Sequence, residues 1–424
     1  MKLLCTADIH LGRQPSRIPE ALAGIKADLT PAAVWRGTVD IALAEEVDAV
    51  LIAGDVVEQN DDFYEAYPEL RTGVDRLAAA NIKVLGVVGN HDVHVLPRLA
   101  DAVPGFTLLG RAGTWERVTV VGKDGTDVDI LGWSYPHDVV TTSPLASLGT
   151  VAKRRTTIGL LHCDRDQSGS RYAPVASADL RNANLDAWLL GHVHKPDIAD
   201  GPQPIGYLGS PIGVDPGETG PHGPWILDVA PDGRLELTHL PLSPLHWLDL
   251  TIDISSVTHA NDVERLILDA IEHEQETFAR AAYRPRVIGC RVRLVGRTDI
   301  AAALRRALDA DDPTTSIIPA GDASYFIHAL HREFRPNVDL VELAHGTDPV
   351  GLLARKLLVL ADPSHPGWAG LIADGRERLE RTMQSRSFKQ LGDPAPDDDT
   401  TMRYLQVAGF EVLERLLQQR KEST

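Results

Sequence analysis

The sequence is short of cysteine and has no long apolar run. Only Cys5, Cys163 and Cys290 occur among 424 residues, and no two are spaced as CxxC. An odd count without that spacing excludes a small disulfide framework and fits a reducing compartment. No apolar run reaches the roughly 18–20 residues of a membrane span. The run at the start is broken at Asp8, too early for a signal peptide. We therefore expect a cytoplasmic protein that does not contact a membrane.

Positive charge is also scarce. Lys and Arg number 42 against 60 Asp and Glu, which leaves a net charge of −18. This balance excludes a generic basic coat for nucleic acid and a polybasic membrane patch. Contact with DNA would need discrete basic stretches, for which 153–155, 280–286 and 291–293 are the candidates. The sequence has no GxxxxGK[ST] motif, so an ATPase that controls this protein would be a separate chain.

The rest of the composition is that of an ordinary folded protein, with 43% hydrophobic and 24% charged residues. In the first 195 residues, short apolar runs that end in polar turns alternate with longer helical stretches. Thr30 as N-cap and Pro31 at the first helical position predict a helix over 32–44. This alternation is typical of an α/β sandwich with a largely central sheet.

The order of patterns predicts three parts. Residues 1–245 form the α/β part, which ends in the proline-rich stretch 241–247. Residues 246–345 show a strand–helix–strand–helix pattern and are expected to be a small α+β domain. Residues 346–424 are expected to be helical, with helices at 349–360, 367–388 and 402–419 and a solvated linker at 390–400.

Five short polar motifs follow five of the predicted strands: Asp8-x-His10, Gly54-Asp55, Gly89-Asn90-His91-Asp92, Leu161-His162 and Gly191-His192-Val193-His194. Each alone is typical of a turn or of a buried histidine. In open α/β sheets, however, ligands bind at the carboxyl ends of strands, so the motifs are expected to converge. Together they supply seven oxygen and nitrogen donors, which suits two divalent metal ions that act on a phosphoester.

In this order the motifs resemble the calcineurin-like metallophosphoesterase superfamily. The opening TADIHLGR and the stretch YLGSP at 207–211 are similar to its SbcD-like DNA repair exonuclease branch. The resemblance implies an αββα-type sandwich, a smaller α+β capping domain and C-terminal helices. It also implies that one metal is held by Asp8, His10, Asp55 and His194, and the second by Asp55, Asn90, His162 and His192, with Asp55 bridging.

In such a site His91 is not a ligand. The resemblance implies that it protonates the leaving oxygen and that Asp92 orients it. A histidine suits this role because its pKa lies near neutrality. The donor set contains no cysteine and includes an amide oxygen, which favours Mn²⁺ and leaves Fe²⁺ and Mg²⁺ open.

The activity implied by the resemblance is a Mn²⁺-dependent DNA exo/endonuclease that works with an SbcC-like, SMC-type ATPase in DNA repair or processing. Its partners would be DNA and that ATPase, and a homodimer is left open. One alternative is a phosphodiesterase for cyclic nucleotides or other small phosphodiesters, for which the additional residues 246–424 are unnecessary. Another is a non-catalytic scaffold of the same fold, against which the complete ligand set argues.

The loop after Asp55 departs from the SbcD-like pattern. It reads GDVVEQNDD, with Val56 and Val57 where an aromatic residue and then Asp or His are usual. His94 is a candidate replacement for the missing histidine, and an ordinary turn histidine is the alternative.

The predicted helix 402–419 has an apolar face that includes Leu405, Val412 and Leu416. A face of this kind packs on a core or in the groove of a partner. The acidic linker before the helix favours an arm that docks on a partner, and packing on its own domain is the alternative.

Overall fold

The structure is a computed structural model that describes residues 1–424 except 153, 199–200, 281–282, 385–394 and 423–424. The chain divides into two compact units. Unit 1 contains Met1–Asp249, Glu274–Arg291 and Ile317–His328, and unit 2 contains Leu250–His273, Val292–Ser316 and Ala329–Thr424. The boundaries predicted at 245 and 345 stay predictions.

Unit 1 contains a six-stranded sheet of order β11-β10-β1-β2-β3-β4. Strands β1 to β4 are parallel, whereas β10 runs antiparallel to β1 and forms a hairpin with β11. The strands are β1 (Lys2–Thr6), β2 (Ala49–Ile52), β3 (Lys83–Gly86), β4 (Phe106–Leu108), β10 (Trp225–Val229) and β11 (Leu235–His239).

A five-stranded sheet of order β5-β6-β7-β8-β9 is the second layer of unit 1. Strands β6 to β9 are parallel and β5 is an antiparallel edge. The strands are β5 (Trp115–Val121), β6 (Asp127–Trp133), β7 (Thr157–His162), β8 (Ala187–Gly191) and β9 (Ile205–Tyr207).

The two sheets of unit 1 pack on each other through one apolar core. Leu51 and Leu85 from the first sheet share this core with Ile130, Ile158 and Leu189 from the second, and all five are buried. Because both faces of a parallel sheet are covered, its strands are almost continuously apolar. The expectation of one central sheet is therefore corrected to two packed sheets, and the αββα-type sandwich is confirmed.

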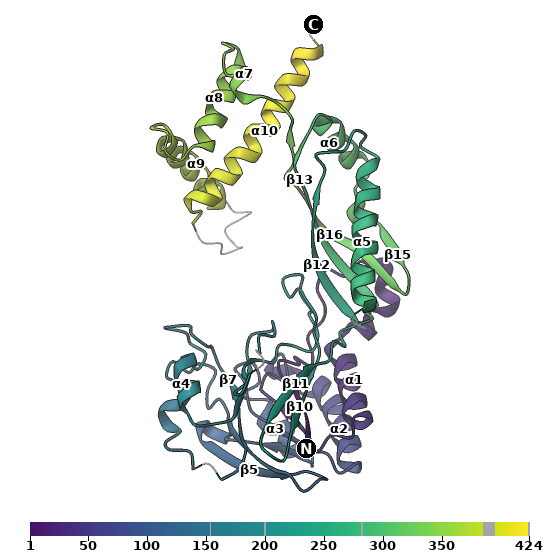
Figure 1. The fold of residues 1–424 in the computed structure, drawn as a ribbon, viewed down its shortest axis with the longest axis vertical. Helices are drawn as coiled ribbons and strands as arrows, with labels where there is room; N and C mark the ends of the chain where they lie inside the picture. The colour runs from purple at the N-terminus through teal and green to yellow at the C-terminus, as the bar shows by residue number, and fades with distance from the viewer. Residues whose placement is uncertain (153, 199–200, 281–282, 385–394, 423–424) are drawn as a thin grey trace. The chain divides into compact units, whose positions relative to one another are not determined.

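Helices cover the outer faces of the sandwich. α1 (Pro31–Ala44) and α2 (Phe63–Ala79) lie side by side in Figure 1 and bury Trp35 and Leu70. As predicted, Thr30 caps α1, and its hydroxyl accepts a hydrogen bond from the N–H of Ala33. The shorter helices are η1 (Glu20–Leu29), η2 (Asn60–Asp62), α3 (Leu96–Ala102), η3 (Arg111–Gly113), η4 (Pro144–Ser147) and α4 (Ser177–Asn182).

A further sheet of order β12-β13-β16-β15 follows in the chain. Its strands are β12 (Leu245–Asp253), β13 (Val287–Val295), β15 (Ile317–Ala320) and β16 (Ala323–Arg332), and its helices are α5 (Asp262–Arg280) and α6 (Ala301–Ala310). The pattern of the sequence predicted β12, α5, β13 and α6 but not the hairpin of β15 and β16. In unit 2, β14 (Arg297–Thr298) pairs in parallel with β17 (Arg335–Pro336), and η5 (Pro313–Thr315) is a single turn.

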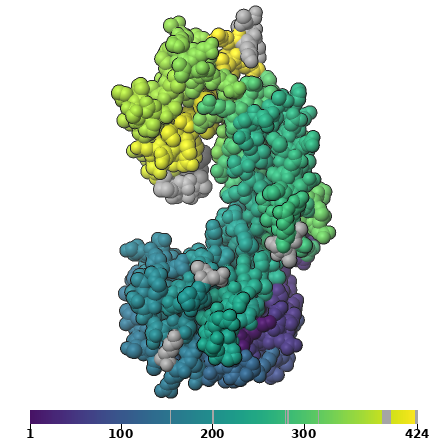
Figure 2. Space-filling view, viewed as in Figure 1, coloured from purple at the N-terminus to yellow at the C-terminus, as the bar shows by residue number. Residues whose placement is uncertain are grey.

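The C-terminal helices of unit 2 form a core of their own. They are α7 (Leu340–Leu343), α8 (Pro349–Ala361), α9 (Trp368–Met383) and α10 (Asp398–Glu422). Leu357, Ile372 and Leu413 are buried where α10 packs on α8 and α9. Figure 2 shows α10, in yellow, directly against the green residues of α8 and α9.

The prediction that Leu405, Val412 and Leu416 form one docking face is wrong. Leu405 and Leu416 pack in the core of α8, α9 and α10, whereas the side chain of Val412 is 49% exposed. α8 and α9 each have an apolar face of their own to bury, and α10 supplies the surface that covers them. Residues 390–394 of the predicted linker lie outside the described residues, and 398–400 belong to α10.

Candidate metal centre

The loops that follow β1 and β2 place the first three predicted ligands together. β1 and β2 are parallel neighbours, so their carboxyl ends meet at one edge of the sheet. The N–H of Asp8 donates to the carbonyl of Gly54, and the N–H of His10 donates to the carbonyl of Asp55, both at 3.0 Å. These two hydrogen bonds hold Asp8 and His10 beside Asp55.

The second sheet brings its histidines to the same place. His162 is the last residue of β7, and His192 and His194 follow the neighbouring strand β8. The N–H of His192 donates to a carboxylate oxygen of Asp8 at 3.0 Å. This bond joins the strand ends of the two sheets, so donors from both layers face one space.

The backbone is strained at four of the predicted ligands. Asp8, His10 and Asp55 have φ angles of 51°, 53° and 49°, and His192 has a φ angle of 106°. Side chains other than glycine rarely adopt these angles, and such residues gather where function holds them in place. The concentration of strain at this edge marks it as a functional site.

Two carboxylates outside the predicted set fix the rings of His10 and His194. Glu58 lies 2.7 Å from Nδ1 of His10, and Glu218 lies 2.5 Å from Nδ1 of His194. The Glu218 carboxylate accepts a hydrogen bond from Nδ1 of His194, and the Glu58 carboxylate attracts a proton to Nδ1 of His10, so each Nε2 presents a lone pair. The two Nε2 atoms are 3.0 Å apart. Two lone pairs at this distance repel unless a cation lies between them, so the histidines fit a metal ion.

The ring of His162 is fixed in the same way. Its Nδ1 donates to the carbonyl of Ala53 at 3.0 Å, which leaves Nε2 as the free donor atom for a metal. That Nε2 lies 3.2 Å from Asp55 and 3.0 Å from the amide oxygen of Asn90. Nδ1 of His192 is also 3.0 Å from the Asn90 oxygen. Four donors therefore face one position.

Asp55 lies between the two groups of donors. The same carboxylate oxygen that is 3.2 Å from His162 is 4.0 Å from Nε2 of His10. Asp8 belongs to a cluster with His10 and His194 and to a second cluster with Asp55 and His162. The seven predicted ligands are thus all brought together, in two overlapping groups.

Burial and charge act against each other in this site. Burial raises the pKa of Asp55, but His162 beside it lowers that pKa, and the balance lies below the usual value. Burial lowers the pKa of His162, and Asp55 raises it to about 9. Burial, helped by the charge of Asp55, raises the pKa of Asp8, and burial, helped by the charge of His162, lowers the pKa of His192 to about 4. The buried carboxylates therefore need cations close by, and His192 stays neutral, as a metal ligand must.

His91 stands at the rim of the cluster. Its N–H donates to Asp55 at 3.0 Å, and its ring Nδ1 donates to the carbonyl of Glu58 at 3.0 Å. Nε2 is therefore the atom left for a substrate. The interpretation that Asp92 orients this ring is wrong. The Asp92 carboxylate accepts from the N–H groups of Gly89 and Val56 at 2.8 and 2.7 Å, so it fastens two loops together. Burial raises the pKa of Asp92 to about 7.

A pocket of about 500 Å³ opens beside His91 and Asn90. Glu58 and Tyr172 also line it, and no lysine or arginine is among its lining residues in the described part of the chain. A phosphate in this pocket would therefore depend on metal ions and on His91 to meet its negative charge.

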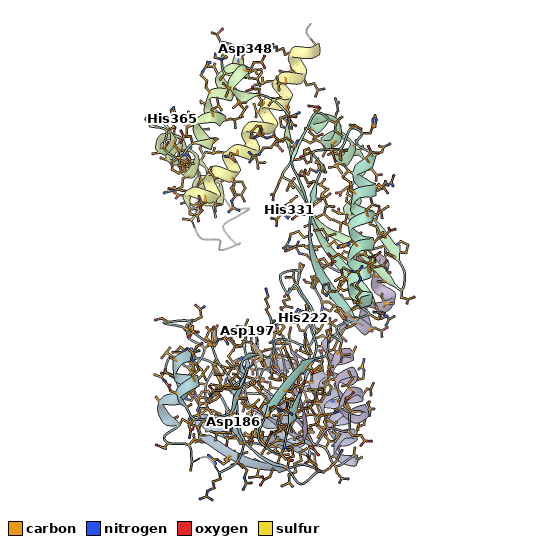
Figure 3. All side chains as sticks on the ribbon, viewed as in Figure 1. Asp186, Asp197, His222, His331, Asp348 and His365 are labelled. Atoms are coloured by element: carbon orange, nitrogen blue, oxygen red, sulfur yellow. The ribbon has the colours of Figure 1, made fainter. Side chains whose placement is uncertain are left out.

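Sequence reasoning missed Glu58 and Glu218. Glu58 lies three residues after Asp55, in the loop where the expected histidine is absent, and that departure was the available signal. Glu218 lies in the glycine- and proline-rich stretch 202–224, where no pattern indicated it. His94 does not fill the gap, because its ring is 59% exposed and pairs with Asp138 at 3.0 Å. The buried ring of His222, labelled in Figure 3, supports the Glu218 loop through the Glu218 carbonyl at 3.1 Å.

The basic stretches proposed for DNA contact are largely neutralised. Three of their arginines form ion pairs of 2.7 to 3.0 Å, namely Arg155 with Asp127, Arg286 with Asp28 and Arg291 with Asp249. Lys153 lies outside the described residues. In the part of the chain that the structure describes, these three arginines form no open basic patch.

Comparison with known families agrees with this geometry. Residues 1–196 match the calcineurin-like phosphoesterase family, and residues 247–315 match the middle domain of the metallophosphoesterase YhaO. The chain therefore contains a calcineurin-like metallophosphoesterase domain, which belongs to a family of metal-dependent hydrolases.

The chain has homologues among SbcD and Mre11 nucleases. It is 27% identical over 364 residues to the SbcD component of the SbcCD nuclease of Rhodobacter capsulatus, covering 73% of this chain and 85% of that protein. It is 27% identical over 298 residues to the DNA double-strand break repair protein Mre11 of Aeropyrum pernix, covering 66% and 71%.

The chain is also 24% identical over 283 residues to a Bacillus subtilis protein described as uncharacterized metallophosphoesterase YhaO, covering 62% of this chain. The matched region spans 65% of that relative's length. Among the described residues, no helix is both long and apolar enough to cross a membrane.

Proposed function

We propose that the chain hydrolyses phosphodiester bonds of DNA at a two-metal centre, with Mn²⁺ as the preferred ion. The observation that carries this proposal is the convergence of seven oxygen and nitrogen donors beside His91 and an open pocket. A donor set without thiolates suits Mn²⁺ better than a structural zinc site, and Fe²⁺ and Mg²⁺ are the alternatives.

Each metal would be held by four of the predicted residues. One set is Asp8, His10, Asp55 and His194, and the other is Asp55, Asn90, His162 and His192. When bound, such ions lower the pKa of a coordinated water and offset the charge of the phosphate. The chain itself contributes the fixed rings, since Glu58, Glu218 and the Ala53 carbonyl turn the ring nitrogens inward.

His91 would donate a proton to the leaving oxygen. Its Nδ1 is held by the Glu58 carbonyl, so Nε2 is the atom that reaches the substrate. A general acid matters most when the leaving group is a poor one, as the deoxyribose oxygen of DNA is. Its position in the lining of the open pocket, where a substrate oxygen can approach, supports this role.

DNA as substrate and an SbcC-like, SMC-type ATPase as partner are supported by the homology to the SbcD and Mre11 nucleases. The chain has no P-loop of its own, so ATP control would come from such a partner. Copurification of the two chains would test the partnership separately from the hydrolysis.

The full chain should be assayed with Mn²⁺, Fe²⁺ or Mg²⁺ on linear DNA, a cyclic nucleotide and bis-p-nitrophenyl phosphate. We expect Mn²⁺-dependent cleavage of DNA and of the p-nitrophenyl ester. Asp55→Asn should abolish both reactions, whereas Asp179→Asn, on the exposed face of α4, should leave them unchanged. Turnover of the cyclic nucleotide without cleavage of DNA would replace the nuclease with a small-molecule phosphodiesterase.

A further inference from the structure

A second pocket, of about 590 Å³, lies within unit 2 between the β-strand residues 293–295 and 331–335 and the first half of α10. Figure 3 labels His331 on β16, which forms one wall. The lining contains five arginines and this histidine, and Glu333 is its one carboxylate. Such an excess of arginine is unexpected in a chain of net charge −18.

Three of the five arginines are neutralised. Arg305 lies 2.9 Å from Glu414 and Arg332 lies 2.5 Å from Asp309. The third, Arg293, lies 3.6 Å from Glu333. These ion pairs offset the charges of the three arginines and leave little net positive charge to attract a ligand.

Arg335 is different, because no carboxylate in the described part of the chain pairs with its guanidinium. Its Nη2 donates to the amide oxygen of Gln406 at 2.8 Å, and its Cζ lies 4.8 Å from the centre of the Phe410 ring. Burial and the nearby charge of Arg297 both lower its pKa. Contacts with a neutral amide and an aromatic ring leave the positive charge of this half-buried guanidinium without a counter-ion. Stacking on the ring also holds the planar guanidinium in place, so that it is pre-organised to bind an oxyanion.

Arg403 adds a second unpaired cation from α10. Its guanidinium donates to the Thr400 hydroxyl at 3.3 Å. Hydrogen bonds from Thr400, helped by the charge of Arg403, lower the pKa of Asp397, but no ion pair to Arg403 within 4 Å occurs among the described residues. Beside it on the pocket wall, the ring of Tyr404 is 61% exposed. An exposed aromatic face next to unpaired guanidinium groups suits an aromatic base attached to a phosphate.

We propose that this pocket binds a nucleotidyl phosphate, with Arg335 and Arg403 on the phosphate oxygens and Tyr404 against the base. Such a group is supplied either by a free nucleotide or by a nucleic-acid strand. Every residue in the proposal belongs to unit 2, so the site is separate from the metal centre of unit 1. It would let an acidic chain hold a phosphorylated ligand without a general basic surface.

The test is a binding titration of the full chain in EDTA, where the metal centre cannot hold phosphate through metal ions. The probes are pyrophosphate, ATP, AMP and a short single-stranded oligonucleotide. We expect nucleotide to bind more tightly than pyrophosphate because of the ring contact. Tighter binding of the oligonucleotide than of ATP would identify a nucleic-acid strand as the source, and the reverse order would identify a free nucleotide. Binding should weaken as salt rises.

Two variants and a matched control locate the binding. Arg335→Gln and Arg403→Gln should each weaken binding by about tenfold or more, the usual effect of losing a charged hydrogen bond of about 1.5–3 kcal/mol. Arg335→Lys should retain only part of the binding affinity of the parent chain, because lysine lacks the planar guanidinium. Arg306→Gln, on the exposed face of α6 outside the pocket lining, should bind like the parent chain. Arg403 is itself exposed, so Arg403→Gln remains informative if Arg335→Gln fails to fold.

The proposal is overturned if no probe binds in EDTA, or if Arg403→Gln and Arg335→Gln bind as tightly as the control. Hydrolysis of bis-p-nitrophenyl phosphate with Mn²⁺ gives an independent reading of the metal centre. The pocket variants should hydrolyse it at the parent rate. Lost binding with intact hydrolysis therefore reports on the pocket alone, and intact binding with no hydrolysis in the parent chain refutes only the proposed metal-dependent function.

Discussion

The candidate metal centre of unit 1 and the helical core of unit 2 bury side chains of opposite character. At the metal centre, the buried side chains are carboxylates and histidines on a strained backbone, as at Asp8 and Asp55. In the core of α8, α9 and α10, the buried side chains are apolar, as at Leu357 and Leu413, in regular helices. Strain and buried charge cost stability, whereas buried apolar area supplies it.

This difference predicts that substitutions in the two regions have different effects. A change at the metal centre should alter metal binding or chemistry with little loss of stability. A change in the helical core should lower stability and leave the chemistry of the folded chain intact. Substitutions in the two regions can therefore test whether chemistry and stability are separable in this chain.

Replacement of His91 by Gln should reduce the rate on DNA by about 10²–10⁴-fold, the usual contribution of a general acid. Metal content and melting temperature should not change, because His91 is not one of the seven predicted ligands. The loss should be smaller on bis-p-nitrophenyl phosphate, whose leaving group needs no proton. Steady-state rates on both substrates and a metal analysis decide this. An equal loss on both substrates, or a loss of metal, would make His91 a ligand instead.

Leu413→Ala should destabilise the chain by about 2–5 kcal/mol, the range for a buried leucine in a packed core. Val412→Ala, one residue earlier and 49% exposed, should cost about 0.5 kcal/mol or less. Thermal or urea unfolding measures both, and the folded Leu413→Ala chain should still bind Mn²⁺. Equal costs for the pair would mean that α10 does not pack on α8 and α9 as described.

His246 links the stability of unit 1 to pH. It is buried against Phe278 and Tyr283, and burial lowers its pKa to about 4, below the ordinary value of 6.5. Between pH 4 and pH 6.5 this histidine is therefore protonated in the unfolded chain and neutral in the folded chain. Its contribution to the free energy of unfolding is present in full above pH 6.5 and is lost as the pH falls toward 4. This one group accounts for roughly 3 kcal/mol at most.

Unfolding of the parent chain and of His246→Leu should be compared at pH 7 and pH 4.5. The variant should lose less stability on acidification, whatever its stability at pH 7. Parallel pH profiles for the two chains would exclude His246 as a source of the acid sensitivity.

Glu218→Gln should weaken metal affinity by about 10–100-fold, as substitutions of residues that orient metal ligands do. The amide oxygen of Gln can still accept the hydrogen bond from Nδ1 of His194, but it lacks the negative charge of the carboxylate. Glu236→Gln, exposed on β11, is the control. Titration with Mn²⁺ measures the change, and an affinity equal to that of the control would show that Glu218 has no part in holding His194 for a metal.

The seven residues proposed as metal ligands could be singled out from the sequence because each lies at or just after a strand end. Parallel strands bring such positions together whatever the details of the loops, as with His162 on β7 and His192 after β8. Glu58 and Glu218 could not be predicted, because their contacts depend on how two loops fold in space. For a related reason the apolar pattern predicted one central sheet, so that only the family resemblance implied the double sheet, and packing of α10 on its own domain was kept only as an alternative. Apolar runs and faces show that a segment is buried but not what covers it.

Metal stoichiometry tests the central claim most directly. The full chain, loaded with Mn²⁺ and freed of excess ion, should contain two Mn²⁺ per chain by elemental analysis. Asp55→Asn should fall well below two and lose hydrolysis, with an unchanged melting temperature in EDTA, because this carboxylate lies between both groups of donors. A parent chain that is fully active with a single ion, or an Asp55→Asn chain that keeps two ions and full activity, would contradict the two-metal account.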